Sequence, residues 1–136
     1  MSAFSNEMEA NIVSHFLQGT AVAHTGGAGT EKVYLALFSG AGPGETGNAN
    51  EVSYSGYARQ HITFSGLDSN GNTSNTAIVT FPANPDSTAV VVAHAGVYST
   101  LAGTTQLLHG ALVASKTLDQ NDVLSFGIGA LVLNIN

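Results

Sequence analysis

Apolar residues recur every four positions near the start of the chain, which is the spacing of one face of an α-helix. The spacing predicts a helix over residues 4–18. Ser5 or Asn6 is suited to cap its start, and Gly19 is placed to end it. The predicted apolar stripe consists of Phe4, Met8, Ile12 and Phe16, widened by Val13 and Leu17.

From residue 32 onward, short apolar segments alternate with loops rich in Gly, Asn and Ser, a pattern typical of β-strands and turns. Segment 32–38 is apolar on both faces, which predicts a central strand covered on each side. Gly110 suggests a bulge or a close backbone approach within its strand, and residues 115–122 are expected to form a polar turn. The other predicted strands are 88–98, 106–113 and one or two strands within 123–135.

The segment from Gly56 to Pro82 carries the clearest strand pattern. Two parts rich in aromatic and β-branched residues, 57–64 and 76–82, flank a polar connection over residues 65–75. Such a pattern predicts a β-hairpin with a long loop. In the second part, alternation places Ile78 and Thr80 on one face and Ala77, Val79 and Phe81 on the other.

The predicted fold class is all-β. Short strands with Gly-rich turns favour an antiparallel β-sandwich or jelly roll of seven or eight strands, preceded by one N-terminal amphipathic helix. We expect a single domain over residues 1–136, with the helix in 1–19 and the sandwich in 31–136. The helix must bury its stripe, either on its own sandwich or on another subunit.

Composition narrows the possible partners. Charged residues make up only 9% of the chain, against about a quarter in ordinary globular proteins. A surface with few charges has little repulsion to keep copies apart, so we expect a homo-oligomer; a Gly-, Ser- and Thr-rich secreted β domain is the alternative. The net charge of −6, with three Lys and Arg in total, predicts no nucleic-acid binding.

Two further classes of protein are not expected. No apolar run approaches the ~20 residues needed to span a bilayer, and the N-terminus lacks the pattern of a signal peptide, so no membrane partner is predicted. The absence of cysteine removes disulfides, thiolate catalysis and cysteine-type zinc sites. The chain is therefore compatible with assembly in a reducing cytoplasm.

Histidines and acids offer the candidate chemistry. His61, His94 and His109 fall in three predicted strands and would form a three-histidine metal site if those strands converged. Hydrogen-bonded or exposed histidines are the preferred alternative, so we expect neither a metal nor a cofactor. Residues 68–72 resemble a calcium loop only in composition and lack the EF-hand spacing. Neither a nucleophile elbow nor a positioned carboxylate pair is present, so no enzyme is predicted.

The candidate contact residues lie on the helix and in the loops. Besides the stripe residues Phe4, Met8, Ile12 and Phe16, they include Pro43 in the loop 39–55. Tyr54 and Tyr57 are candidates for stacking on a sugar, or for the core or an interface. Arg59, the only arginine, is expected to form an inter-strand or inter-subunit ion pair, with Glu51 as its suggested partner. Loops 39–55 and 65–75 are the expected contact surfaces.

The order of these segments resembles a family of structural proteins from short-tailed phage virions, and the resemblance covers nearly the whole chain. Its most specific parts are Gly56-Tyr57-Ala58-Arg59-Gln60 and Ser74-Asn75-Thr76-Ala77 followed by Thr80-Phe81-Pro82. Members are commonly labelled tail-fibre proteins, and the group is similar to small jelly-roll cement or decoration proteins. The resemblance implies no catalytic residues.

Two functions are consistent with this resemblance. The first is a capsid cement or decoration protein that binds the major capsid protein and copies of itself, as a dimer or trimer, on the surface of the icosahedral head. The second is a tail-fibre or tail-tip module that contacts the host. We favour the head, because the chain lacks the coiled coil or repeated shaft of a self-standing fibre.

Overall fold

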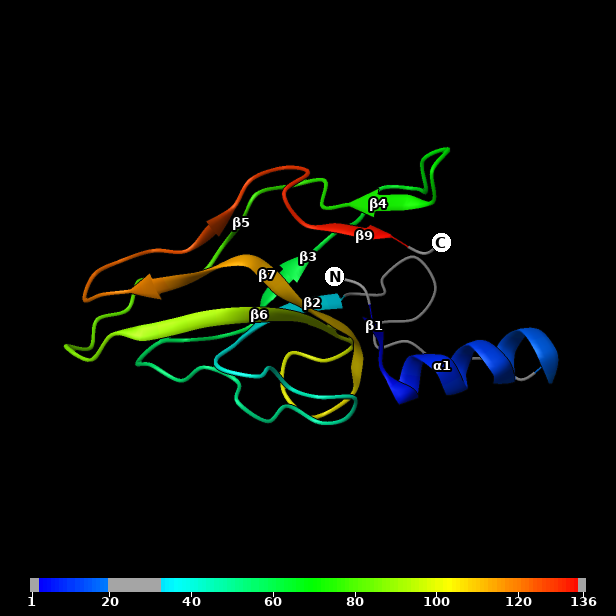
Figure 1. Ribbon diagram of the computed structural model, residues 1–136, viewed down its shortest axis with the longest axis horizontal. Coiled ribbons are helices and arrows are strands. Elements are labelled where there is room, and N and C mark those ends of the chain that lie inside the picture. Colours follow the sequence, from blue (N-terminus) through cyan, green and yellow to red (C-terminus); the bar gives the residue numbers. More distant parts are fainter. Residues whose placement is uncertain (1–2, 20–32, 135–136) are drawn as a thin grey trace.

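The computed structural model describes residues 3–19 and 33–134 (Figure 1). Helix α1 spans Asn6–Ile12 and continues as a π-helical turn over Val13–Leu17. The strands are β1 Ala3–Phe4, β2 Val33–Phe38, β3 Gln60–Ile62, β4 Asn72–Ser74, β5 Val79–Thr80, β6 Val90–Tyr98, β7 Gln106–Leu118, β8 Ser125–Phe126 and β9 Val132–Asn134. The strand pairs are antiparallel, and eight strands follow the helix among the described residues, so the predicted all-β class is confirmed. Lys32 and Ile135, at the ends of predicted strands, lie outside the described residues.

Strand β2 is central, as its two apolar faces predicted. It lies between β6 and β3 in a five-stranded sheet of order β1-β7-β6-β2-β3. Its residues Leu35 to Phe38 have no exposed surface. Leu35 and Leu37 belong to the main core, whereas Ala36 and Phe38 pack with Tyr98 on the opposite face. Both faces of this strand are therefore covered.

The main core lies between the large sheet and a second layer made of two short ladders, β4 with β9 and β5 with β8 (Figure 1). Burial of each large apolar side chain contributes about 1.5–3 kcal/mol relative to leaving it exposed. The buried residues of this core include Leu35, Leu37, Val79, Phe81, Val92, Val97, Leu107, Leu118, Leu124, Leu131 and Leu133.

The outer face of the large sheet is covered by residues 39–50, here called the covering loop. Gly42 and Pro43 in this loop are buried, and the Tyr98 hydroxyl donates a 2.7 Å hydrogen bond to the Gly47 carbonyl. Gly42 has a φ of +76°, and a Cβ there would lie 2.9 Å from the His94 ring. This position therefore requires glycine, both for its backbone conformation and for the close approach of the ring.

The predicted hairpin over residues 57–64 and 76–82 forms only in part. The two parts are joined by the Phe64–Asn75 bridge and by a 2.9 Å hydrogen bond from the Thr76 amide to the Thr63 carbonyl. Beyond it β3 and β5 still contact each other but are not paired, because β3 joins β2 in the large sheet while β5 joins β8 in the second layer. The predicted alternation is nevertheless correct at its centre: Val79 and Phe81 are buried, and Ile78 and Thr80 are exposed.

Strand β7 is longer than its polar sequence suggested. Residues 115–118, expected in a turn, continue the strand because Lys116, Thr117 and Leu118 pair with Val92, Val91 and Val90 of β6. The turn is confined to residues 119–122. Of the two alternatives for Gly110, the bulge is wrong, because Gly110 pairs in register with Ala95 and the register shifts fall on either side of it.

The helix begins later than predicted. The Ser5 hydroxyl accepts a hydrogen bond from the Met8 amide and caps the helix. Ser5 itself is extended, with φ −78° and ψ 160°, so Phe4 lies in β1 and pairs with Leu108 rather than joining the helix. Phe4 and Met8 pack against the main core. No helix among residues 3–19 and 33–134 is long and apolar enough to cross a bilayer.

Candidate functional site

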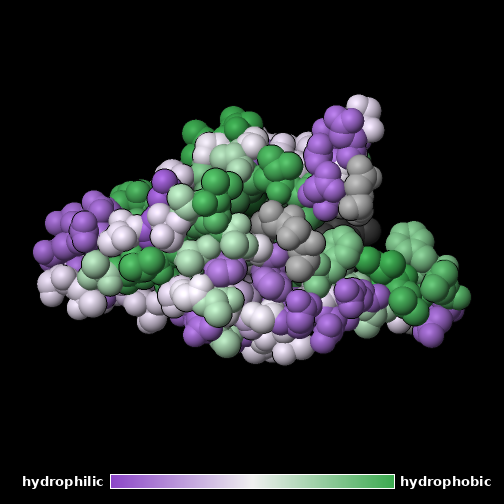
Figure 2. Space-filling model, viewed as in Figure 1, coloured by the Kyte–Doolittle hydropathy of each residue, from purple (hydrophilic) through white to green (hydrophobic). Residues whose placement is uncertain are grey.

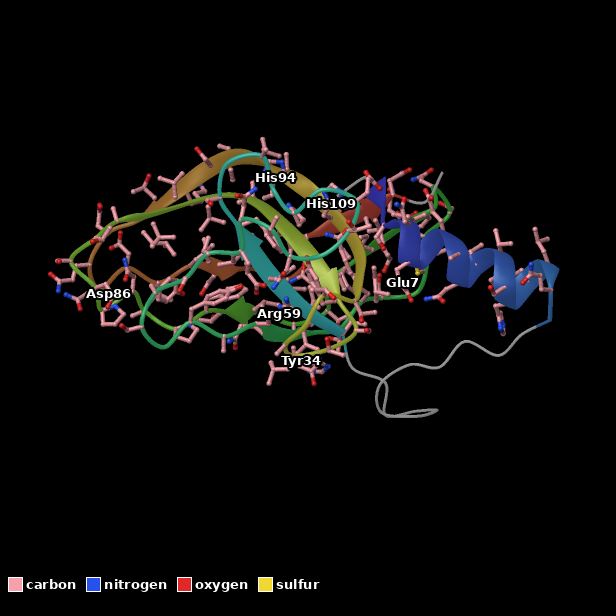
Figure 3. All side chains as sticks on the ribbon, turned by 90° about the horizontal axis from the view of Figure 1, so that it is seen from below. Glu7, Tyr34, Arg59, Asp86, His94 and His109 are labelled. Atoms are coloured by element: carbon pink, nitrogen blue, oxygen red, sulfur yellow. The ribbon has the colours of Figure 1, made fainter. Side chains whose placement is uncertain are left out.

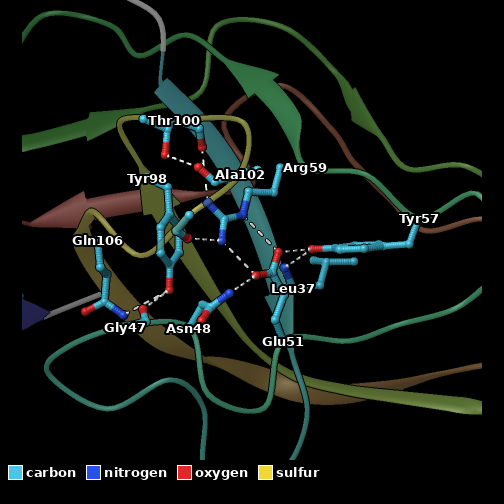
Figure 4. A network of polar contacts seen from close by, with 11 residues as sticks. Leu37, Gly47, Asn48, Glu51, Tyr57, Arg59, Tyr98, Thr100, Ala102 and Gln106 are labelled. Atoms are coloured by element: carbon cyan, nitrogen blue, oxygen red, sulfur yellow. Dashed lines mark hydrogen bonds and ion pairs between the residues drawn. The ribbon is translucent and has the colours of Figure 1, made fainter. Parts of the chain in front are cut away.

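Arg59 lies at the centre of a buried polar network (Figure 4). Its side chain is 3% exposed and forms a two-pronged ion pair with Glu51, with Nη2–Oε2 at 2.7 Å and Nε–Oε1 at 2.9 Å. The suggested Glu51 partner is confirmed, and the pair lies within one chain. Bidentate geometry of this kind fixes both side chains.

The same guanidinium holds the loop between β6 and β7. Its Nη1 donates to the Thr100 carbonyl at 3.1 Å, and its Nη2 donates to the Gly103 carbonyl at 2.8 Å. The Arg59 Cζ also lies 3.9 Å from the centroid of the Tyr98 ring, which adds a cation–π contact. Arg59 therefore joins the segment before β3 to the end of β6 and the loop that follows it.

Glu51 has no unused hydrogen-bonding capacity. Each of its oxygens accepts one bond from Arg59, and Oε1 also accepts from the Tyr57 hydroxyl while Oε2 accepts from Asn48 Nδ2. Burial raises the pKa of Glu51, but the hydrogen bonds and charge of Arg59, with the bonds from Asn48 and Tyr57, outweigh it and bring the pKa below its usual value. The carboxylate is thus held in its charged form.

The network is built to hold loops rather than to bind a ligand. A shallow depression of about 270 Å³ lies beside Glu51, Tyr57 and Arg59. The charged atoms at its wall already bond to the protein, and the Tyr57 hydroxyl both donates to Glu51 and accepts from the Leu37 amide. Burial raises the pKa of Tyr57 well above its usual value, so this phenol stays protonated.

The two candidate stacking tyrosines point inward. Tyr54 is 7% exposed and donates from its hydroxyl to the Pro82 carbonyl at 2.8 Å. The Tyr57 ring stacks on Phe81 with an angle of 3° between the planes, and it contacts the Tyr54 ring edge-on. Pro43, a third candidate contact residue, is buried in the covering loop. These three side chains stabilise the sandwich.

The three histidines considered as possible metal ligands do not converge. His94 and His109 lie close together on β6 and β7 (Figure 3), and His109 Nε2 is 3.6 Å from Glu45 Oε1. His61 pairs with Tyr34, which pairs in turn with Tyr98. It therefore lies four residues, or about 13 Å, further along the sheet than His94. Among the residues that the structure describes, no cluster of three or more His, Cys or acidic side chains is suited to a metal ion.

Asp68, the acidic residue of the calcium-like segment 68–72, stabilises a turn within its own loop. Asp68 Oδ1 accepts from the backbone amides of Asn70 and Asn72, each at 2.8 Å. These hydrogen bonds lower the pKa of Asp68 and keep its carboxylate directed at its own loop. In the turn before β8, Asp122 Oδ2 likewise accepts from the Asp119 amide at 2.9 Å.

The candidate contact surface is the end of the helical segment, residues Val13–Leu17, here called the helix tip. Phe16 is 75% exposed and Leu17 79%, and Val13 is 44% exposed. Among the described helices and strands, the tip packs only against α1. Figure 2 shows it as an apolar projection at one end of the molecule. Of the residues in the predicted apolar stripe, Phe16 is thus largely exposed to solvent, whereas Ile12 is half-buried.

A second surface, an apolar groove, was not expected from the sequence. It has a volume of about 430 Å³ and is lined by the base of the helix and by strands of both layers. Its lining residues come from distant parts of the chain, so no local pattern signals it. They include Met8, Val33, Phe64, Leu67, Leu107 and Leu133.

Comparison with known proteins gives a family for this chain. The family model described as Podophage GP4 fiber I protein gp80 matches residues 3–134. No curated protein matches the chain. The matched span includes both the helix tip and the apolar groove, together with every described strand.

Proposed function

The chain belongs to the Podophage GP4 fiber I protein gp80 family and is a structural protein of a phage virion, and from this premise we propose that it forms part of the tail fibre. The observation that carries the proposal is the family match over residues 3–134. The match favours the tail-fibre alternative. The capsid cement function had been preferred from the sequence because the chain lacks the coiled coil or repeated shaft of a self-standing fibre.

The geometry supports a mechanical role. The covering loop and the loop after β6 are both fastened to the large sheet by buried groups, Tyr98 for the first and Arg59 for the second. A sandwich with fastened loops transmits load with little internal movement, because close-packed interiors have low compressibility. The projecting helix tip is the part free to engage a neighbour.

Immunoelectron microscopy tests the location. Antibodies raised against the full chain, applied to intact virions, are expected to label the tail fibres and leave the head unlabelled. Even labelling over the head surface would contradict the proposal and favour the cement alternative, with the major capsid protein as partner. Virions from a phage lacking the gene provide the background control.

Host contact is the second part of the tail-fibre hypothesis. The loop between β3 and β4 is exposed and is braced internally by Asp68, so it can present a fixed surface. Purified protein is expected to bind host cells. Failure to bind, together with fibre labelling on virions, would leave a fibre component that does not itself contact the host.

A further inference from the structure

A polar cleft lies where the start of the helix meets the covering loop. It has a volume of about 460 Å³, and its walls come from the first turn of α1, the covering loop and the segment that leads into β7. These three segments are far apart in the sequence, so folding alone brings them together. The polar side chains that line the cleft are those of Asn6, Glu7, Glu45, Thr46, Thr104 and Gln106.

The backbone on two sides of the cleft is held in place. The Asn6 amide donates to the Glu45 carbonyl at 3.4 Å, which joins the helix start to the covering loop. The Tyr98 hydroxyl donates to the Gly47 carbonyl at 2.7 Å, which joins the same loop to β6. Glu7 and Glu45 therefore enter the cleft from neighbouring backbone positions that are already fixed.

One side chain in the wall is buried and lacks a hydrogen bond at its oxygen. Gln106 is 1% exposed, and its Nε2 donates to the Tyr98 hydroxyl at 3.2 Å. That hydroxyl uses its own proton on the Gly47 carbonyl, so it accepts from the nitrogen of the amide and cannot donate to the oxygen. Gln106 Oε1 is thereby directed away from Tyr98 (Figure 4) and has no hydrogen-bond partner among the described residues.

This unpartnered oxygen indicates a positively polarised ligand. A buried acceptor that has lost its bonds to water is costly, and such an atom in a native protein points to an ion or a water molecule. Gln106 lines the polar cleft together with Glu7 and Glu45. Two carboxylates beside the amide oxygen disfavour an anion, whereas a cation interacts favourably with all three groups.

The donor atoms narrow the kind of cation. The side chains that line the cleft offer carboxylate, amide and hydroxyl oxygens, and none of the lining residues is His, Cys or Met. Such a set suits hard cations. Calcium accepts six to eight oxygens, amide carbonyls included, in flexible geometry, whereas magnesium requires near-ideal octahedral geometry and keeps several of its waters. Donors from three separate segments therefore favour calcium.

No strong positive group competes for the carboxylates. Among the described residues that line the cleft there is neither Lys nor Arg. His109 Nε2 lies 3.6 Å from Glu45 Oε1 and forms no hydrogen bond with it. The net charge of −6 adds a general attraction for cations. Glu45 and Glu7 are thus free to bind a metal ion.

We propose that the polar cleft binds a calcium ion, with Glu7 and Glu45 as carboxylate ligands and Gln106 Oε1 directed at the ion from the buried side. Water completes the coordination shell, for which the volume of the cleft leaves room. The ion ties the helix start to the covering loop. The site belongs to one chain, so the inference stands apart from the location of the protein in the virion.

Calorimetric titration of the purified full chain, first freed of metal with a chelator, tests the site. Calcium chloride is expected to bind with one ion per chain and a Kd of about 0.1–1 mM, the range of extracellular calcium modules. Calcium at about 10 mM is then expected to raise the thermal unfolding midpoint. Magnesium chloride at the same ionic strength is expected to give a smaller rise.

Single substitutions locate the ion. Glu7→Gln and Glu45→Gln are each expected to weaken calcium binding roughly tenfold or more, because each removes one ligand charge. Glu9→Gln removes the same charge from an exposed site on α1 outside the cleft, and it is expected to bind calcium like the wild type. Circular dichroism in the presence of chelator checks that all three variants are folded.

The outcomes separate a specific site from general charge effects. Absence of calcium binding by the wild type would overturn the proposal and leave a water molecule as the partner of Gln106. Equal responses to calcium and magnesium would overturn it too, as would a Glu45→Gln variant that binds as tightly as Glu9→Gln. Gln106→Leu is expected to weaken binding as well, and unchanged affinity in that variant would remove Gln106 from the site.

Discussion

Arg59 shows how much structure one residue can organise in a chain with few charges. Its guanidinium ties Glu51, the Tyr98 ring and the loop after β6 into one unit. Removing one partner of a buried ion pair leaves the other charge uncompensated, which costs about 3–5 kcal/mol. The network is therefore the most sensitive polar feature described in the sandwich.

We expect Arg59→Met to lower the free energy of unfolding by about 3–5 kcal/mol, because Glu51 would lose both prongs of its ion pair. Chemical denaturation measures this change. Lys116→Met, at an exposed cation on β7, is the control and is expected to shift stability by less than about 0.5 kcal/mol. Adding Glu51→Gln to Arg59→Met is expected to recover part of the loss; no recovery would show that the pair acts through packing alone.

Glu51 also predicts a loss of stability in acid. Its pKa is lower in the folded protein than in the unfolded chain. The stability that it contributes is therefore complete above the unfolded pKa of about 4.3 and is lost as the pH falls through the folded pKa. Denaturation midpoints measured from neutral pH downward are expected to fall more steeply for the wild type than for Glu51→Gln. Parallel profiles would contradict this role.

Gly42 and Gly44 form a natural pair for testing the covering loop. Both have a φ near +75°, but a Cβ at Gly42 meets the His94 ring at 2.9 Å, whereas a Cβ at Gly44 meets nothing within 4 Å. Gly44→Ala is expected to cost about 1 kcal/mol for its backbone conformation alone. Gly42→Ala should cost a further ~1–3 kcal/mol for overpacking. Equal losses in thermal unfolding would show that the ring moves aside freely.

At the scale of elements, the helix is attached to the sheet through Ser5. This side chain is fully buried, and its hydroxyl accepts from Met8 and donates to the Gln106 carbonyl. The start of helix α1 and strand β7 are therefore both hydrogen-bonded to the Ser5 hydroxyl. The orientation of the tip depends on this junction.

Ser5→Ala is expected to lower stability by about 1–2 kcal/mol, the range for loss of a helix N-cap. It should also increase hydrogen exchange at the Met8 and Glu9 amides, since the helix start loses its cap. Ser53→Ala, at an exposed site, is the control and is expected to change neither. Unaltered exchange in α1 would contradict the capping role.

The sequence allowed some elements to be predicted better than others. Strands β2 and β6 were found because their apolar patterns are continuous and tertiary pairing agrees with them. The hairpin forms only next to its loop because β3 and β5 find their strand partners in different layers, a choice made by the topology rather than by local propensity. Arg59 and Glu51 were paired correctly because the chain has no second arginine. The groove depends on side chains brought together only by folding.

At the scale of the whole molecule, the scarcity of charge shapes how copies meet. The two apolar surfaces described above, the helix tip and the apolar groove, carry no Asp, Glu, Lys or Arg. The remaining net charge of −6 gives a weak repulsion between copies, and salt screens such repulsion. Apolar contacts are not weakened by this screening.

We therefore expect self-association to be unchanged or tighter as sodium chloride rises from about 0.05 M to 1 M, since the Debye length shrinks to about 3 Å over that range. Sedimentation at several salt concentrations provides the measurement. Dissociation at high salt would show that ion pairs, rather than apolar contacts, hold the copies together.

The strand order β1-β7-β6-β2-β3 also has a consequence for synthesis. Strands β1 and β2 leave the ribosome early, yet their partners β7 and β6 begin only at Gln106 and Val90. The large sheet cannot close until most of the chain has been translated, so the apolar β2 must wait with β3 alone beside it. Such non-local pairing slows folding, and the nascent chain should depend on the host's chaperones during that interval.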